Sequence, residues 1–198
     1  MSTTLERRLG FLREADKLKG ILRQSRLTFD VERRENDAEH SWHLALMVLV
    51  LAEQAADPAI DRVRVLRMVL VHDLVEIDAG DTFLYDEAAR RTQAAREAAA
   101  ADRLFGMLDE PLGSELRTAW EEFEARVTPE AKFARAIDRA QPILQNLYTA
   151  GISWRQHGVR AADVRARNRT VSEEGAPALW AHLEALLADA VREGTLAE

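Results

Sequence analysis

Signals that start α-helices recur along the chain, and this feature restricts its fold more than any other. Asn36 and Glu39 are spaced like a capping box, in which each side chain bonds the backbone N–H of the other residue. Asp57 and Thr128 each precede a proline, which is favoured at the first position of a helix. Apolar residues at helical spacing follow each signal. The expected helices cover residues 4–22, 36–54, 57–76, 86–108, 112–126, 128–148 and 176–192.

No stretch of the chain predicts a strand. The apolar run VLVLA at residues 48–52 is the best candidate, but it lies inside a capped helical pattern. Hydrophobic residues make up 47% of the 198 residues, which is ample material for a core. The sequence has no internal repeat, linker or break in composition. We therefore expect a single all-α domain over residues 1–198, a helical bundle with further C-terminal helices over residues 151–198.

Charge and cysteine content exclude several classes of protein. Lys and Arg number 27 against 34 Asp and Glu, a formal net charge of −7, which argues against binding a nucleic acid polymer. The chain has no cysteine, so any metal must be held by nitrogen and oxygen ligands. The N-terminus lacks the apolar core of a signal peptide, and the apolar run at residues 44–52 is far shorter than the ~20 residues that span a bilayer. We expect a soluble cytoplasmic protein that does not enter a membrane.

Five ionisable residues fall on or beside the apolar faces of three expected helices. His40 lies one turn before the apolar stripe of its helix, on the same face. The stripe of the next helix continues into Asp73 and Glu76, and His72 lies beside it. Asp138 lies beside an inward-facing isoleucine of the helix that starts at Thr128. Helical geometry therefore points all five side chains toward the interior.

Such a cluster of interior acids needs a compensating positive charge, because burying an unpaired carboxylate is very costly. A divalent cation is one source of that charge. Two imidazoles and two carboxylates suit Mn, Fe, Co, Ni or Zn better than calcium. The sequence therefore predicts one divalent transition metal ion per chain.

Each residue of the cluster also has an ordinary structural interpretation. Asp73 could form a salt bridge with Arg67 or Arg139, and a lone interior histidine is usually a satisfied core residue. Asp78 and the acids around it could form a solvated helix end, although acids at a C-terminus oppose the helix dipole. Three of the five histidines, however, fall on the two helices in question, and we interpret His43 among them as a supporting or core residue. Taken together, the pattern favours a metal site.

The motifs that carry these residues resemble those of a known family. ENDAEHS contains His40, LVHDLVE contains His72 and Asp73, and AIDRAQP contains Asp138. This order, His…His-Asp…Asp, resembles the HD-domain metal-dependent phosphohydrolases, over about residues 5–150. Within that family, the spacing around the first histidine and after the HD pair is similar to the 5′-deoxynucleotidase branch. The resemblance implies an all-α bundle of the HD type.

The resemblance also implies roles for individual residues. It makes Glu76 the catalytic acidic residue after the HD pair, and it implicates Asp81 in positioning substrate or water. Members of this branch remove phosphate from deoxynucleoside monophosphates and are typically homodimers. The metal ligands that the resemblance implies are His40, His72, Asp73 and Asp138.

The region that binds substrate in that branch is where this chain departs from the pattern. The nucleotidases carry an arginine and a tryptophan upstream of the first histidine, whereas the segment LRQSRLTFD has arginines and no tryptophan. A solvated basic loop is the alternative for these arginines. Trp154 could stack on a base or seal the core, and we favour the core. The candidates for a phosphate clamp are Arg23, Arg26, Arg33 and Arg34.

The sequence thus predicts metal-dependent hydrolysis of a 5′-(deoxy)nucleoside monophosphate to nucleoside and phosphate. The same cluster could instead serve a nucleoside triphosphate, guanosine tetraphosphate or cyclic nucleotide hydrolase. The Gly-Tyr-Pro extension of cyclic-dinucleotide phosphodiesterases is absent. A metal-containing nucleotide-binding module without turnover is a further alternative, which the intact set of ligands and Glu76 disfavours.

Overall fold

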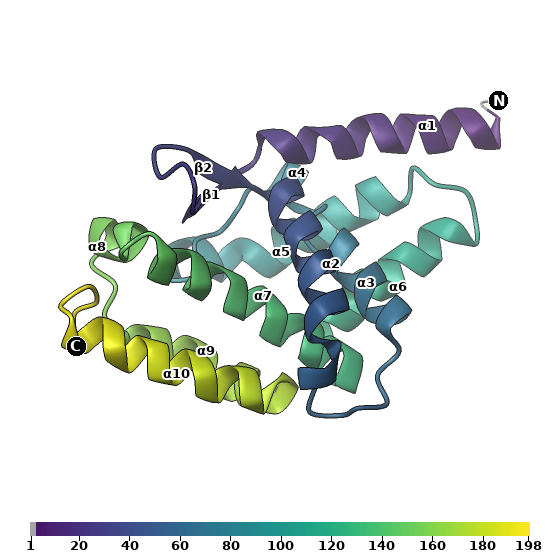
Figure 1. The fold of residues 1–198 in the computed structure, drawn as a ribbon. Helices are drawn as coiled ribbons and strands as arrows, with labels where there is room; N and C mark the ends of the chain where they lie inside the picture. Colours follow the sequence, from purple (N-terminus) through teal and green to yellow (C-terminus); the bar gives the residue numbers. More distant parts are fainter. Residues whose placement is uncertain (1–2) are drawn as a thin grey trace.

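The computed structural model describes residues 3–198, apart from the side chains of residues 87, 89 and 90. It is predominantly helical, which confirms the all-α class, with one small hairpin (Figure 1). The elements, with η for 3₁₀-helices, are α1 (Thr4–Ala15), η1 (Asp16–Gly20), β1 (Leu22–Arg26), β2 (Arg34–Asn36), α2 (Asp37–Leu51), η2 (Ala52–Gln54), α3 (Arg62–Val71), α4 (Glu76–Ala79), α5 (Glu87–Phe105), α6 (Leu112–Ala125), α7 (Pro129–Tyr148), α8 (Ile152–His157), α9 (Ala161–Gly175) and α10 (Pro177–Arg192).

Two of the three predicted helix starts are confirmed. Asn36 and Glu39 form the capping box at the start of α2, and the Thr128 hydroxyl accepts a hydrogen bond from a backbone N–H in the first turn of α7. The third start was wrong. Asp57 caps only a turn, and α3 begins after Asp61, whose carboxylate accepts the N–H groups of the first turn.

The segment between α1 and α2 differs most from the predicted pattern. The expected helix over 4–22 ends at Gly20, and the expected loop contains the antiparallel strands β1 and β2. The Arg34 guanidinium fixes this hairpin by donating to the carbonyl of Leu22 at 3.0 Å and to that of Arg23. The strands are short and largely polar, so they carry no alternating apolar signal.

Two further differences concern helix boundaries. The predicted helix over 57–76 is two helices, because α3 ends at Val71 and the chain turns through His72–Val75 before α4. Gly80 then ends α4 with a φ of 75°, a conformation that favours glycine. The helix α9 was not predicted individually, because its buried face consists of small and polar residues such as Asn168 and Ser172.

The helix α7 lies at the centre of the packing. It contacts α2, α3 and α6 on one side and α9 and α10 on the other. Figure 1 shows α7, α9 and α10 running side by side. Phe133 and Ile137 of α7 are fully buried, as are Leu44 of α2 and Met68 of α3. The buried apolar side chains form one cluster that spans these helices. Polar residues on the inner faces of α2, α3 and α7 are therefore brought into one place.

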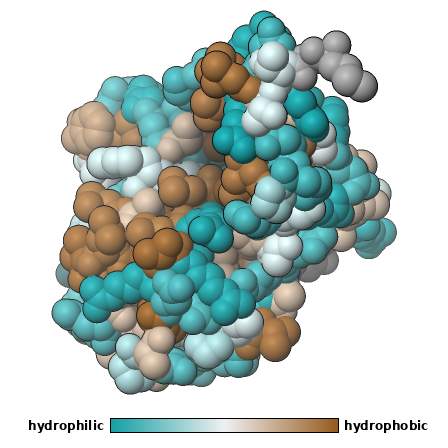
Figure 2. All heavy atoms as spheres, turned by 90° about the vertical axis from the view of Figure 1, so that its right-hand side faces the viewer, coloured by the Kyte–Doolittle hydropathy of each residue, from teal (hydrophilic) through white to brown (hydrophobic). Residues whose placement is uncertain are grey.

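One face of α2 and α3 remains apolar and exposed. Leu70, expected to belong to the buried stripe of its helix, is 51% exposed. Figure 2 shows apolar side chains gathered on the face that forms the right-hand side of Figure 1. Among the helices of residues 3–198, none combines the length and the low charge that a bilayer-crossing segment needs. The large exposed apolar residues of α2 and α3 are Trp42, Leu46, Leu49, Val50, Val63 and Leu70.

Candidate active site

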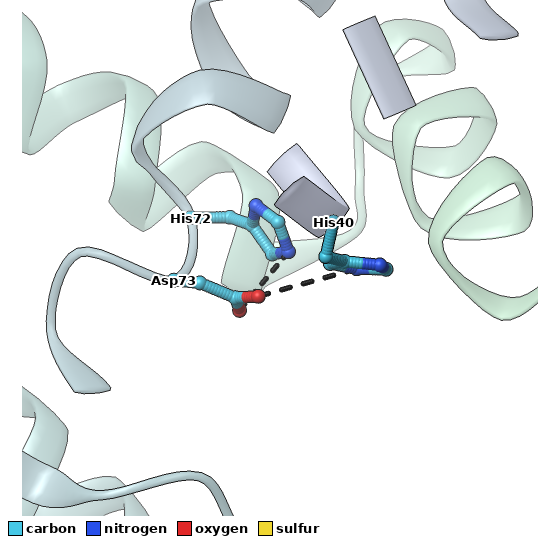
Figure 3. A group of neighbouring side chains, drawn as sticks. All are labelled: His40, His72 and Asp73. Carbon is cyan, nitrogen blue, oxygen red and sulfur yellow. Dashed lines mark ion pairs between the residues drawn. The ribbon is translucent and has the colours of Figure 1, made fainter. Parts of the chain in front are cut away.

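The predicted cluster of histidines and acids lies where α2, α3 and α7 meet. His40 comes from the first turns of α2, His72 and Asp73 directly follow α3, and Asp138 lies in the middle of α7. All four side chains are buried. Figure 3 shows His40, His72 and Asp73 pointing toward one another from two separate elements. The convergence expected from the helix faces is therefore present.

The ligand-type atoms of these residues lie close together. His40 Nε2 is 3.1 Å from Asp138 Oδ1, and His72 Nε2 is 3.0 Å from Asp73 Oδ1. The cross distances, from His72 Nε2 to Asp138 Oδ1 and from His40 Nε2 to Asp73 Oδ2, are 3.8 and 4.0 Å. Each histidine Nε2 thus lies within 4.0 Å of an oxygen of both carboxylates, and His40, His72 and Asp73 form a group that could hold a metal ion.

Hydrogen bonds fix both imidazole rings in the orientation that a metal ligand needs. His72 Nδ1 lies 3.0 Å from the carbonyl of Val69, and His40 Nδ1 lies 3.1 Å from Gln141 Oε1. The Gln141 amide is itself fixed, because its nitrogen donates to Glu35 Oε1 at 2.6 Å. Each Nδ1 can therefore donate its proton outward, which leaves Nε2 for the cluster.

The residues fit a divalent cation. His72 Nε2 is buried, and apart from the ion pair with Asp73 at 3.0 Å it makes no hydrogen bond of good geometry among the described residues. Burial lowers the pKa of His72, but the charges of Asp73 and Asp138 outweigh it and raise that pKa. The surroundings thus favour a positive charge at this point, whether it is a proton or a metal ion.

The carboxylates of the site divide into two groups. Burial alone would raise the pKa of Asp73, but His72 and Arg23 outweigh it and lower the pKa to about 2. Burial is likewise outweighed at Asp138, where the hydrogen bond with His40 and two nearby arginines hold the pKa well below its usual range. Both carboxylates are therefore ionised, as metal ligands must be.

The second group consists of acids that face other acids. Burial and the charge of Asp73 raise the pKa of Asp37 to about 7, although Arg23 opposes this. Burial, with Asp73 and Asp37, raises the pKa of Glu76 well above its usual range. Burial also raises the pKa of Asp81, against the effect of Arg23. Oxygens of Asp37, Asp73 and Glu76 lie within 4.8 Å of one another, so these carboxylates form a second group that could hold a cation.

A cavity of about 340 Å³ opens beside the cluster. His72, Asp73, Glu76, Asp81 and Asp138 all line it. Its size lies at the lower end of the range for small-molecule sites. The cluster is therefore accessible to a small ligand.

Of the four arginines predicted to bind phosphate, the structure brings Arg23 alone to the cavity wall. Its Nη1 lies 2.9 Å from Asp73 Oδ2 and 3.1 Å from Asp37 Oδ1. Asp73 therefore pairs with Arg23 rather than with Arg67 or Arg139. Arg33 forms an exposed ion pair with Glu39. Arg26 donates to the carbonyl of Glu32 at 2.9 Å, and Arg34 holds the hairpin as described above.

Sequence reasoning missed three arginines that line the cavity, Arg126, Arg135 and Arg139. Burial and the charge of Arg135 lower the pKa of Arg139 to about 9. A signal for two of them was present, because AIDRAQP places Arg139 directly after Asp138, and Arg135 lies three residues before it on the same helical face. Asp37, inside the ENDAEHS motif, was also missed.

The remaining residues singled out from the sequence have structural surroundings. Trp154 is buried, as we favoured, and its indole also lines the cavity. The His157 ring lies against the Phe83 ring at a tilt of 45°, with ring centroids 4.6 Å apart, which joins α8 to the loop after Asp81. Asp78 pairs at the surface with Arg103 of α5, at 2.7 Å.

The fold and this cluster define the class to which the chain belongs. The HD domain family matches residues 15–180, which is most of the chain. The chain therefore belongs to the HD-domain family, as its motifs predicted.

Individual relatives show which members of this family the chain is similar to. The crystal structure of a predicted metal-dependent phosphohydrolase from Magnetospirillum magnetotacticum MS-1 is similar over 98% of this chain and 96% of that one, with a TM-score of 0.92 and 50% sequence identity. The 5′-deoxynucleotidase HDDC2 of Bos taurus is 34% identical over 137 residues, which are 69% of this chain and 65% of that protein. The human protein of the same name is 33% identical with the same coverage. The alignments thus span slightly less than two thirds of the length of these two relatives.

Proposed function

We propose that this protein is a metal-dependent phosphohydrolase that converts a 5′-(deoxy)nucleoside monophosphate to nucleoside and phosphate. The observation that carries the proposal is the cluster of His40, His72, Asp73 and Asp138, in which each histidine Nε2 lies within 4.0 Å of both carboxylates. All of these residues except His40 line the cavity. The names of the relatives agree with this reaction, since the two mammalian proteins are 5′-deoxynucleotidases.

These four residues would hold one divalent ion through nitrogen and oxygen donors, a set that suits Mn, Fe, Co, Ni or Zn. When bound, such an ion polarises a phosphoryl oxygen and lowers the pKa of water. The glutamine beside His40 and the carbonyl beside His72 keep both rings in the orientation for binding. Asp73 and Asp138 supply the negative charge that keeps a cation in place.

Glu76 would accept the proton of the attacking water. Its side chain is 8% exposed, it lines the cavity, and its Oε2 has no hydrogen-bond partner among the described residues. Burial and the neighbouring acids raise its pKa, so its ionised form is a stronger base than an ordinary carboxylate, and a bound cation beside it would favour that ionised form. Asp81 borders the same cavity and would position the water or the substrate.

The size of the cavity supports a mononucleotide. At about 340 Å³ it fits a single nucleotide better than a cyclic dinucleotide. Phosphate release from a panel of mono-, di-, tri- and cyclic nucleotides and sugar phosphates, with Mn, Co and Mg tested separately, would check the proposal. We expect release from 5′-monophosphates and a preference for the deoxy forms. Comparable release from unrelated sugar phosphates, or from triphosphates alone, would contradict it. Metal and nucleotide binding without any release would favour the binding module.

The protein is further proposed to be a cytoplasmic homodimer. A chain without cysteine gains nothing from an oxidising compartment. The exposed apolar face of α2 and α3 is the natural contact, since Trp42, Leu46 and Leu49 recur there at helical spacing. Light scattering should show a dimer that Leu49→Glu converts to a monomer. Val127→Glu, which changes an exposed apolar residue outside α2 and α3, is the control. A monomeric parent would contradict the proposal.

A further inference from the structure

Three arginines meet on one wall of the cavity beside Asp138. Arg135 Nη1 lies 3.4 Å from Asp138 Oδ2, and Arg139 Nε lies 3.9 Å from the same oxygen. Arg126, directly after α6, lines the cavity as well. Asp138 therefore turns Oδ1 toward the two histidines and Oδ2 toward the arginines, so the arginine wall adjoins the metal site.

The guanidinium groups of this wall lack sufficient partners. The side chains of Arg135 and Arg139 are only 13% and 15% exposed, and the Nε–H of each is buried without a hydrogen-bond partner among the described residues. Apart from Asp138, Glu124 lies 3.6 Å from both Arg135 and Arg126. Among the described residues, these three arginines therefore have two carboxylates within 4.0 Å, those of Asp138 and Glu124. Burying like charges together is costly, so such a wall is expected to receive an anion.

The setting of Arg23 on the hairpin is the opposite. Its guanidinium lies within 4.0 Å of three carboxylates, those of Glu35, Asp37 and Asp73. Its charge is thus already balanced by the protein, whereas the charge of the arginine wall is not.

Phe123 packs against one arginine of this wall, Arg135. Its fully buried ring lies under the Arg135 guanidinium at 4.9 Å and against the His72 ring at 4.7 Å between centroids. One side chain therefore sets both the arginine and the predicted metal ligand. A planar guanidinium held in this way presents its N–H groups as a fixed fork, which matches the oxygens of a phosphate.

We propose that Arg135 and Arg139, with Arg126 at the outer edge, form an anion subsite that binds the non-bridging oxygens of the substrate's phosphoryl group. The ligand class is a phosphate monoester dianion or its inorganic phosphate product. This inference rests on the proposed function, and it assigns phosphate binding to α6 and α7 rather than to the β1–β2 hairpin.

Binding of inorganic phosphate to the metal-loaded protein, followed by calorimetry, tests the subsite directly. Arg139→Met keeps the length and the apolar stem but removes the charge, and we expect the Kd for phosphate to rise about 10-fold to 100-fold, the usual effect of losing a charged hydrogen-bonding partner. Arg139→Lys should recover part of the affinity. Arg117→Met is the matched control, because Arg117 lies on α6 in surface ion pairs with Asp102 and Glu121. Its Kd should stay within about twofold of the parent.

Metal content and unfolding midpoint separate this role from a purely structural one. If Arg139 belongs to an anion subsite, Arg139→Met should keep its metal. Without phosphate it should also be at least as stable as the parent, because the variant has one positive charge fewer beside Arg135 and Arg126. If Arg139 is only a structural counter-ion of Asp138, Arg139→Met should lose metal or stability while its affinity for phosphate stays unchanged. Should Arg139→Met fail to fold, Arg126→Met at the outer edge must still weaken phosphate binding about threefold or more.

Unchanged phosphate affinity in both variants overturns the subsite. The two proposals fail in different ways. A parent that binds phosphate through Arg139 but releases none from any nucleotide overturns the proposed function and leaves the subsite standing. A parent that hydrolyses mononucleotides with a KM that Arg139→Met does not alter overturns the subsite alone.

Discussion

Without its metal, the fold should lose stability as the pH rises, and Asp37→Asn should remove much of that loss. Asp37 is fully buried, and its carboxylate faces those of Asp73 and Glu76. Burial and the charge of Asp73 raise its pKa from 3.8 to about 7. The unfolded chain therefore releases this proton near pH 4, whereas the folded chain keeps it until near neutrality.

The magnitude follows from proton linkage. Between the two pKa values the folded state binds more protons than the unfolded state, so the free energy of unfolding falls as the pH rises. A single group that titrates at 3.8 when unfolded and at about 7 when folded loses about 2 kcal/mol between pH 5.5 and pH 8. The raised pKa values of Glu76 and Asp81 act in the same direction. With a urea slope of about 2 kcal/mol per molar, Asp37 alone shifts the midpoint by about 1 M.

Urea unfolding followed by circular dichroism, in the presence of a chelator at pH 5.5 and pH 8, measures this effect. We expect the parent to unfold at clearly lower urea at pH 8 and Asp37→Asn to show a much smaller difference. Asp78→Asn, which removes a surface carboxylate paired with Arg103, should behave like the parent. Saturating metal should restore stability at pH 8, since a bound cation stabilises ionised carboxylates. A chelated parent that is as stable at pH 8 as at pH 5.5, or an Asp37→Asn variant with the full dependence, would refute the reasoning.

Two further predictions concern catalysis and packing. Glu76→Ala should keep its metal while kcat falls about 10²-fold to 10⁴-fold, whereas His40→Ala should lose its metal and its activity. Metal analysis and kcat of both variants measure this. Loss of metal from Glu76→Ala would show that Glu76 is a ligand. Gly175→Ala should destabilise the protein by about 1–3 kcal/mol, because a Cβ there would meet the Lys132 carbonyl and lie 2.8 Å from the Ala136 Cβ. Gly10→Ala, with nothing within 4 Å, should stabilise α1 by about 0.5–1 kcal/mol, and equal thermal midpoints for the two variants would contradict this account.

The helices that could be predicted are those in which several signals agree. In α2 and α7 a capping residue, an apolar stripe and a helical length coincide, and both starts were placed correctly. The helix α9 packs closely on α7, and its buried residues include Asn168, Ser172 and Gly175, so no hydrophobicity pattern distinguishes this face from a surface. The turn between α3 and α4 was not predicted for a related reason. Its residues, 72–75, continue the apolar pattern of α3, although the side chains of His72 and Asp73 belong to the site.

The cluster of histidines and acids could be predicted because polar residues on an apolar helix face are visible in a sequence. Helical spacing alone placed His40 and His72 on the inner side of their helices, and the structure brings both to within 4.0 Å of Asp73. Their role as metal ligands stays a prediction. The position of the arginines was not visible in the same way, because Arg26 and Arg33 depend on a hairpin that carries no apolar signal.

The arginine wall was overlooked for an electrostatic reason. A cation beside an acid on a helix is ordinarily its surface salt-bridge partner, and Arg135 three residues before Asp138 fits that pattern. Folding buries the pair and turns the other oxygen of Asp138 toward the histidines. The spacing of Arg135 and Asp138 therefore does not indicate a surface salt bridge here. The cavity is thereby polarised. On the side of Asp73 lie acids whose pKa values are raised, and on the side of Asp138 lie the arginines that we propose bind phosphate. In the proposed hydrolysis, the acids would act on the attacking water and the arginines on the non-bridging oxygens of the phosphoryl group, so the two groups would have separate tasks.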